Sequence, residues 1–325
     1  MPATSPMSRN RNRSARQAGG AAALPAAGRH MRDNTDSPGR LLLLAVWLAV
    51  LAVVLLFMMV LAAALPTISS PGPGGPLDWL WLPSQGRFGI LPMCVGSLAL
   101  ALLALGLGWP LALGLACWLL TEESATARPL TRFVNGLIRF MTTVPTVVYG
   151  FAAVFLLTPL ARTVLGGTGM CLASAAVMLV LLVLPTMVLI LMAGLRPRLD
   201  RLCPWGLALG FSRLDLLRLF VLPGSGRTLA SAAVLGFGRA VGDTLIPLML
   251  AGNATQVPGG LAESMRSLTA HMALVTANEV GGAAYTSLFA AGLVLLAVNT
   301  GASLVLRRLV RSSSGPVPAG SGGAA

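Results

Sequence analysis

Long apolar runs separated by short polar segments dominate the chain. Six of these runs extend for about 20 residues or more, the length that an α-helix needs to cross the hydrocarbon core of a bilayer. We therefore predict six transmembrane helices. They are expected over about residues 41–65, 90–120, 133–157, 170–195, 228–250 and 283–306.

The composition agrees with this pattern. The 325 residues are 55% hydrophobic and only 10% charged, with a mean hydropathy of +0.80. Soluble domains carry about 25% charged residues, so this chain lacks the polar surface that a soluble protein needs. We expect an all-α membrane protein.

The basic residues predict the topology. All of them are arginine, and the formal net charge is +13. They gather in alternate connections: Arg128 and Arg132; Arg196, Arg198, Arg201, Arg213, Arg218 and Arg227; Arg307, Arg308 and Arg311. Because cytoplasmic loops carry the excess of basic residues, both termini are predicted to be cytoplasmic. Membrane topology therefore explains the positive charge better than nucleic-acid binding does.

Three regions follow from these patterns. Residues 1–39 form a basic tail without apolar periodicity, predicted to be disordered, cytoplasmic and in contact with membrane lipid. Residues 40–310 form the transmembrane domain, with a basic cytoplasmic loop at about 196–227. Residues 311–325 form a flexible C-terminal tail. The first apolar run is too long for the core of a signal peptide, so we expect it to remain as a helix.

Arg239 lies inside the predicted fifth span. It is eleven residues from the start of that span, or about 16 Å deep, where a charge costs at least ~2.5 kcal/mol. Asp243 follows at i+4 and is expected on the same face, with Thr244 beside it. Two interpretations remain: an ion pair that fixes helix packing, or a polar element lining a path for a charged solute such as an anion.

The cytoplasmic loop contains a short amphipathic segment. Leu214, Leu217 and Val221 recur at helical spacing, while Arg213 and Arg218 occupy other faces. Ser212 is expected to cap this helix, and Pro223 with Gly224 to end it. Such a helix either lies on lipid or inserts its apolar ridge into a groove of a soluble partner.

Candidate catalytic chemistry is sparse. There is no acidic cluster typical of a metal site, and the four cysteines are scattered in apolar runs as packing residues. We expect no cofactor and no bound metal. An intramembrane enzyme using His271 or Asp243, and a passive anion channel, remain as alternatives.

Four stretches together resemble one family. Gly210 is followed, after nine residues, by Phe220-Val221-Leu222-Pro223, as in the EAA loop of permease subunits of ATP-binding-cassette importers. GRAVGDT at 238–244, VPTVVYGF at 144–151 and FGILPMCVGSLAL from 88 are similar to motifs of the phosphate-specific permeases. MRSLTAHMALVTANEV, from 265, is closer to the PstC type than to the PstA type. The resemblance covers about residues 40–310.

This resemblance implies a fold, partners and site residues. The fold would be the type I importer permease, a non-catalytic subunit of the bacterial cytoplasmic (inner) membrane that translocates phosphate. Its partners would be a PstA-like second permease, a cytoplasmic ATPase dimer and a periplasmic or extracellular phosphate-binding protein. The translocation path would include Arg239, Asp243 and Thr244. The loop docking on the ATPase would include Gly210, Ser212, Arg213, Leu214, Leu217 and Pro223.

Two positions depart from the family pattern. Pro204 stands where the loop usually has glutamate, followed by Trp205 and Gly206 in place of two alanines. Proline suits a first helical turn but cannot make the polar contacts of a glutamate, so we expect the coupling contact to be rearranged. Asp243 stands where the family has glutamate. A related oxyanion as the solute is therefore retained as an alternative to phosphate.

Overall fold

The computed structural model describes residues 36–68, 75–122, 128–279 and 281–312. Most of the predicted basic tail and nearly all of the predicted C-terminal tail lie outside these residues. Contacts divide the chain into two units, Met1–Leu55 and Leu56–Ala325. The described part of the first unit is a single apolar helical segment, whose side chains from Leu41 onward are exposed.

The described elements are helical apart from one hairpin. In chain order they are α1 (Asp36–Ile68), β1 (Trp81–Leu82), η1 (Pro83–Gln85), β2 (Arg87–Phe88), α2 (Leu91–Thr121), α3 (Arg128–Thr143), α4 (Thr146–Leu165), α5 (Leu172–Ala208), α6 (Arg213–Leu216), η2 (Leu217–Val221), α7 (Leu222–Gly224), α8 (Gly226–Gly242), α9 (Leu245–Leu250), α10 (Leu268–Asn278) and α11 (Gly282–Ser312).

The apolar helices confirm a multi-span membrane protein. Five of them are long and apolar enough to cross a bilayer: Leu41–Pro66, Leu91–Thr121, Thr146–Leu165, Leu172–Ala208 and Ala284–Val305. A sixth span results if α6–α7 and α8, which are bent by 76° at their junction, count as one. The predicted number of six is therefore the upper value.

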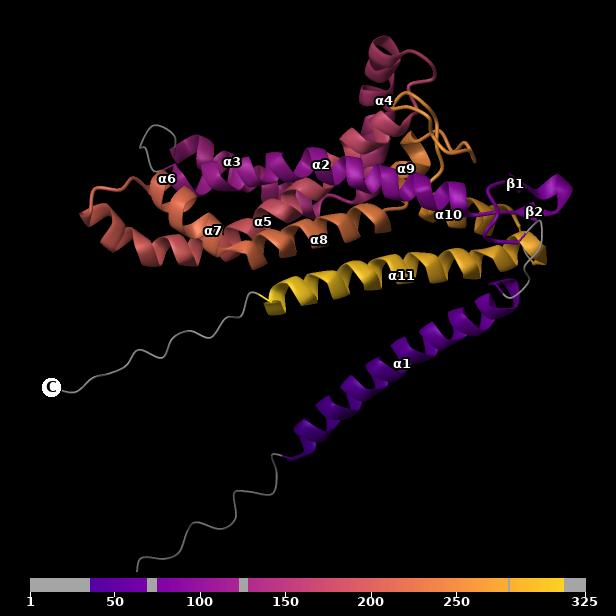
Figure 1. Ribbon diagram of the computed structural model, residues 1–325, viewed down its shortest axis with the longest axis horizontal. Helices are drawn as coiled ribbons and strands as arrows, with labels where there is room; N and C mark the ends of the chain where they lie inside the picture. Colours follow the sequence, from indigo (N-terminus) through magenta and orange to yellow (C-terminus); the bar gives the residue numbers. More distant parts are fainter. Residues whose placement is uncertain (1–35, 69–74, 123–127, 280, 313–325) are drawn as a thin grey trace, which may run out of the picture. The chain divides into compact units, whose positions relative to one another are not determined.

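Four helices of the second unit run side by side (Figure 1). α2 packs against α5 and α8, and α8 also packs against α5 and α11. Close approach depends on small residues. A Cβ on Gly236 of α8 would lie only 2.7 Å from the sulfur of Met187 of α5, and alanines line the buried face of α2. Small side chains let helix backbones approach, which favours association inside a bilayer.

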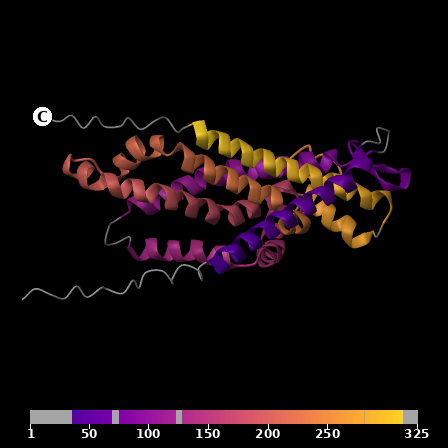
Figure 2. The same cartoon turned by 90° about the horizontal axis from the view of Figure 1, so that it is seen from below.

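The predicted third span is wrong in its bounds. The structure has two helices there, α3 and α4, which are separated by Val144 and Pro145. The break has a local cause, because the residue before a proline is pushed out of the α-helical region. α3 runs in the direction of the bundle and packs on α5, whereas α4 crosses that direction steeply and packs on α9 and α5 (Figure 2).

The fourth span continues beyond its predicted end. α5 extends through Ala208, well past residue 195, and includes Pro185, Pro197 and Pro204. Pro204 is therefore four residues from the end of a long helix, and not in the first turn of a new one. The cause is that α5 does not stop before the basic loop.

The loop predicted at 251–282 contains a helix that the pattern did not indicate. α10 lies at the end of the bundle that carries the β1–β2 hairpin, opposite the end that carries α6 (Figure 1). Its His271 is fully buried and contacts the Trp81 ring edge to face, with 4.2 Å between ring centroids. Apolar contacts with α11 bury Val275 as well. Burial of this kind stabilises a helix too short to be stable alone.

Candidate functional site: a helix break at Asp243 and a turn at Gly210

A break interrupts the apolar helix that follows the basic loop. α8 ends at Gly242, and Asp243 has an extended conformation with φ −72° and ψ 130°. The cause lies four residues further on, where Pro247 has no N–H to donate to the carbonyl of Asp243 and its ring would clash with that carbonyl. The freed carbonyl instead accepts a hydrogen bond of 2.8 Å from the hydroxyl of Thr269 in α10.

The side chain of Asp243 also has a structural partner. Its Oδ2 accepts a hydrogen bond of 2.9 Å from the backbone N–H of Ile246, in the first turn of α9. This contact satisfies one of the donors that a helix leaves unpaired at its N-terminus. Asp243 is therefore held at a half-buried position between α8, α9 and α10, with Thr244 next to it and equally half-buried.

Arg239 does not form the expected ion pair with Asp243. An ion pair of 3.3 Å joins Arg87 to Asp78, whereas none joins Arg239 to Asp243. The i, i+4 geometry requires both residues to lie in one helix, and α8 ends before Asp243.

Arg239 points away from the packing of its own chain. Ala232, Gly236 and Ala240 form the buried face of α8. Leu235 and Arg239 lie on the exposed face, where Leu235 is 52% exposed. A charge on this face is free to meet a solute or a neighbouring subunit.

Tyr149 joins α4 to α3 across the break at Pro145. Its hydroxyl donates a hydrogen bond of 2.8 Å to the carbonyl of Met141. The hydroxyls of Thr142 and Thr143 donate to backbone carbonyls of their own helix, at 2.7 Å each. Of these side chains, Tyr149 is thus the one that connects the two helices across the break.

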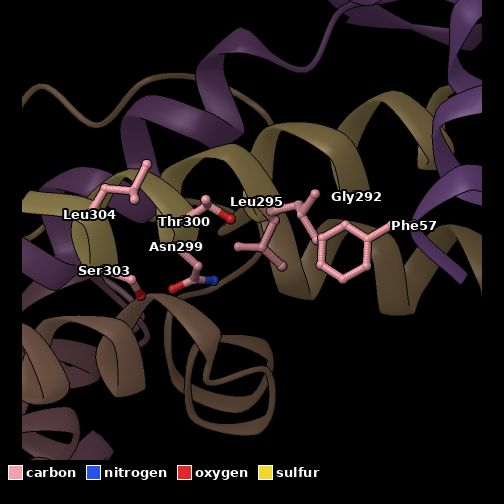
Figure 3. A pocket seen from close by; sticks show the side chains of 8 residues that line it. Phe57, Gly292, Leu295, Asn299, Thr300, Ser303 and Leu304 are labelled. Carbon is pink, nitrogen blue, oxygen red and sulfur yellow. The ribbon is translucent and has the colours of Figure 1, made fainter. Parts of the chain in front are cut away.

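A polar group on α11 was missed in the sequence. Asn299, Thr300 and Ser303 line a hollow of about 480 Å³, with their oxygen atoms shown in Figure 3. The carboxamide of Asn299 faces α8, because a Cβ placed on Gly238 would lie 3.7 Å from its Oδ1. The sequence does indicate this group, because three polar residues occur within five consecutive positions inside the last apolar run.

The turn at Gly210 terminates α5 in a Schellman motif. Gly210 has φ +85°, a left-handed conformation that glycine adopts without steric cost. The N–H of Phe211 bonds to the carbonyl of Gly206 at 3.0 Å, and the N–H of Gly210 bonds to that of Leu207 at 3.1 Å. Gly210, which matches the glycine of the loop motif in the sequence, is therefore the residue that this left-handed backbone conformation favours.

Ser212 begins the next helix with a capping box. Its hydroxyl accepts a hydrogen bond of 3.2 Å from the N–H of Asp215, and the Asp215 carboxylate accepts one of 3.1 Å from the N–H of Ser212. At the far end, Arg198 of α5 donates to the carbonyl of Gly224 and to the hydroxyl of Ser225. The loop is thereby fixed to α5 at both ends.

The expected apolar ridge of the loop is divided between two environments. Leu217 and Val221 are buried in the core, with 0% and 2% exposure, whereas Leu214 is 38% exposed. Leu217 therefore cannot present its side chain to a partner.

Near Leu214 the loop exposes other large apolar residues, namely Trp205, Leu207, Leu209, Leu219 and Phe220. Phe211 and Phe220 contact each other edge to face. Arg213 is half-buried and Pro223 is exposed.

A bundle of long apolar helices, one of which is interrupted by a polar break, is typical of a multi-span membrane protein. The chain belongs to the family described as "Binding-protein-dependent transport system inner membrane component", whose sequence profile matches residues 108–314. It is therefore a transporter component of a cell membrane and not an enzyme. Such a permease works with a substrate-binding protein, an ATPase and a second permease.

Several relatives have informative names. The chain is 29% identical over 235 residues to the "Probable ABC transporter permease protein YqgH" of Bacillus subtilis, covering 72% of this chain and 75% of the relative. It is 26% identical over 256 residues to the "Phosphate transport system permease protein PstC" of Haemophilus influenzae, covering 72% and 79%. A PstC of Xylella fastidiosa is 28% identical over 253 residues, covering 71% and 76%.

Solved structures confirm the predicted permease fold. An inward-facing methionine ABC transporter, MetNI, superposes with a TM-score of 0.57 at 16% identity, covering 73% of this chain and 100% of the other. A bacterial ABC transporter that imports alginate superposes with a TM-score of 0.52 at 15% identity, covering 81% and 99%.

Proposed function

We propose that this chain is the PstC-like permease subunit of an importer that moves inorganic phosphate across the bacterial cytoplasmic membrane. The observation that carries the proposal is the position of Arg239. It is a charged residue on the exposed face of the apolar helix α8, close to the helix break at Asp243. A guanidinium binds phosphate oxygens through paired donors. The PstC names of several relatives support the choice of solute.

In this mechanism the chain supplies the path and does no chemistry. Arg239 attracts the anion, and the half-buried Asp243 and Thr244 beside it shape the polar segment of the path. Asp243 also keeps the break open by capping α9. ATP is hydrolysed by the cytoplasmic partner dimer, and a PstA-like second permease completes the path. A phosphate-binding protein delivers the solute at the end of the bundle that carries α10, with both termini of the chain on the cytoplasmic side.

The loop at 196–227 is the proposed docking surface for the ATPase. Gly210 and Ser212 set the backbone of the turn, Arg213 begins the helical stretch that follows it, and Pro223 lies near the end of that stretch. The exposed Leu214, together with Trp205 and Phe220, would enter a groove of the ATPase. Leu217, which is buried, would act as the support beneath them.

Phosphate uptake in cells that lack other phosphate importers tests the proposal. Expression of the chain with its partners is expected to restore uptake, and Arg239→Ala is expected to abolish it. Arg162→Ala is a matched control, because Arg162 donates to the carbonyl of Thr168 in an exposed turn. Uptake that needs no ATPase would indicate a passive channel instead. Competition by another oxyanion at lower concentration than phosphate would indicate a different solute.

A further inference from the structure

α3 divides its residues into three stripes. Thr131, Val134, Ile138 and Met141 form the inner stripe toward the rest of the chain. At 100° per residue, the exposed Leu130, Phe133, Leu137 and Phe140 fall on one flank of this stripe. Arg128, Arg132 and Arg139 fall on the other flank, within about 40° of one another. The three arginines, all exposed, are therefore segregated from the apolar side chains.

The direction of α3 decides between two environments for this basic flank. An amphipathic helix at a membrane surface lies flat, across the direction of the spans. α3 instead runs along the direction of the bundle and packs on α5 (Figures 1 and 2). From Arg128 to Arg139 the helix rises about 16 Å, roughly half the thickness of the hydrocarbon core. Because Arg128 and Arg132 belong to a connection predicted to be cytoplasmic, we infer that Arg139, about 10 Å further along α3, lies at membrane depth.

An arginine at that depth requires a polar environment. Exposure to hydrocarbon costs at least ~2.5 kcal/mol, so such a side chain faces protein or a water-filled space. None of the three arginines has an ion pair or a side-chain hydrogen bond to another described residue. The apolar flank suits a lipid or protein neighbour, and the basic flank suits an aqueous path that anions enter.

Tyr149 relates this flank to the break that follows Arg239. Its hydroxyl bonds to the carbonyl of Met141, two residues after Arg139. Its own helix, α4, packs on α9, which begins after the break at Asp243. α4 therefore connects the element that carries Arg139 to this break.

We propose that Arg128, Arg132 and Arg139 form the cytoplasmic continuation of the anion path, along which phosphate passes after leaving Arg239. Arg139 makes the first of these contacts and contributes to the rate and selectivity of release. The inference rests on the proposed function. The ligand chemistry is a phosphate oxyanion, and its source is the transported inorganic phosphate, as opposed to the headgroup of a phospholipid.

Uptake of radiolabelled phosphate by the complete transporter in lipid vesicles tests this inference. Arg139→Gln is expected to lower uptake at least about tenfold, because one charge-assisted contact is lost. Arg139→Lys should recover part of the activity, and Arg162→Gln should match the wild type. Comparable uptake by Arg139→Gln and the wild type overturns the inference and leaves the proposed function intact. A wild type that transports no phosphate overturns both.

Vesicles with and without phosphatidylglycerol separate the two sources of phosphate. If Arg139 contacts the transported phosphate, Arg139→Gln should lower uptake to the same extent in both kinds of vesicle. A defect seen only with phosphatidylglycerol would assign the arginines to lipid headgroups and overturn the inference.

Cysteine labelling gives a readout that does not depend on transport. In a transporter whose four native cysteines are replaced by alanine, Arg139→Cys should react with a negatively charged thiol reagent, and phosphate should slow the reaction. Phe133→Cys, on the opposite flank, is the matched control and should show no protection by phosphate. Equal behaviour of the two cysteines would contradict the assignment of the basic flank to the path.

Discussion

The hydroxyl of Ser97 in α2 accepts a hydrogen bond of 2.6 Å from the backbone N–H of Leu268, the first residue of α10. Both residues are buried, with 7% and 2% exposure. The bond fixes a short helix at the end of the bundle and satisfies a donor that this helix would otherwise bury unpaired.

Ser97→Ala is therefore expected to loosen α10. A buried N–H without a partner costs about 1–3 kcal/mol. Amide hydrogen exchange in α10 should accelerate by a corresponding factor, measured by mass spectrometry on the purified protein. Thr276→Ala is the control on the same helix, because its hydroxyl is exposed and bonds within α10. Equal exchange in both variants would show that Ser97 does not hold the helix.

Two substitutions separate the capping role of Asp243 from its charge. Asparagine caps a helix about as well as aspartate, so Asp243→Asn should preserve thermal stability, whereas Asp243→Ala should lose about 1 kcal/mol. If transport needs the negative charge, both variants lose phosphate uptake although only one loses stability. Normal uptake by Asp243→Asn would leave Asp243 with a structural role alone.

Gly210→Ala tests the turn at the end of α5. Space is available around Gly210, so the cost arises from its φ of +85° alone, about 1 kcal/mol for a residue with a side chain. Gly136→Ala is the comparison, because Gly136 lies within α3 with nothing near a new Cβ. That change should stabilise the protein by up to ~1 kcal/mol. Thermal unfolding followed by circular dichroism measures both, and equal shifts in Tm would contradict the conformational argument.

Substitutions at Leu214 and at Leu217 are expected to have different effects. Leu217 is fully buried, so Leu217→Ala should destabilise the protein by about 2–5 kcal/mol. Leu214 is 38% exposed, so Leu214→Asp should change stability little and reduce co-purification of the ATPase. An ATPase that remains bound to Leu214→Asp would contradict the proposed docking surface.

Stability should depend on pH through His271. Burial and, to a lesser degree, the positive charge of Arg266 together lower the pKa of His271 to about 4. Between pH 6.5 and 4 the unfolded chain binds a proton that the folded chain excludes, so stability falls as pH falls through this window. The slope approaches ~1.4 kcal/mol per pH unit.

His271→Gln removes this titration and supplies the control. Its Tm should change less between pH 7 and 4.5 than that of the wild type. Parallel curves for the two proteins would show that His271 does not titrate in this window.

The apolar runs were enough to place most of the spans. α2 and α11 differ from their expected starts by a single residue, because hydropathy over about 20 residues dominates local effects. The same averaging conceals short breaks. The gap at Pro145 and the end of α8 at Gly242 depend on single prolines, and neither changes the mean hydropathy of its run.

Contacts between distant residues explain the remaining differences. α10 is stabilised by burial against the hairpin, α2 and α11, which no local pattern reveals. The division of the loop between buried Leu217 and exposed Leu214 depends on where α5 ends. Helical spacing identified Arg239 and Asp243 as neighbours. It could not show that Pro247 removes Asp243 from the helix.

The hydrogen bond from Thr269 to the carbonyl of Asp243 gives α10 a mechanical role. Through this bond and that of Ser97, α10 joins the scaffold helix α2 to the break beside Arg239. In the proposed orientation α10 lies, with the β1–β2 hairpin, at the end of the bundle that an arriving binding protein would contact. A displacement of α10 from outside would then reach the break directly, whereas the ATPase would act on it by way of the loop at Gly210. The two ends of the transporter would thus act on the break at Asp243 by separate routes.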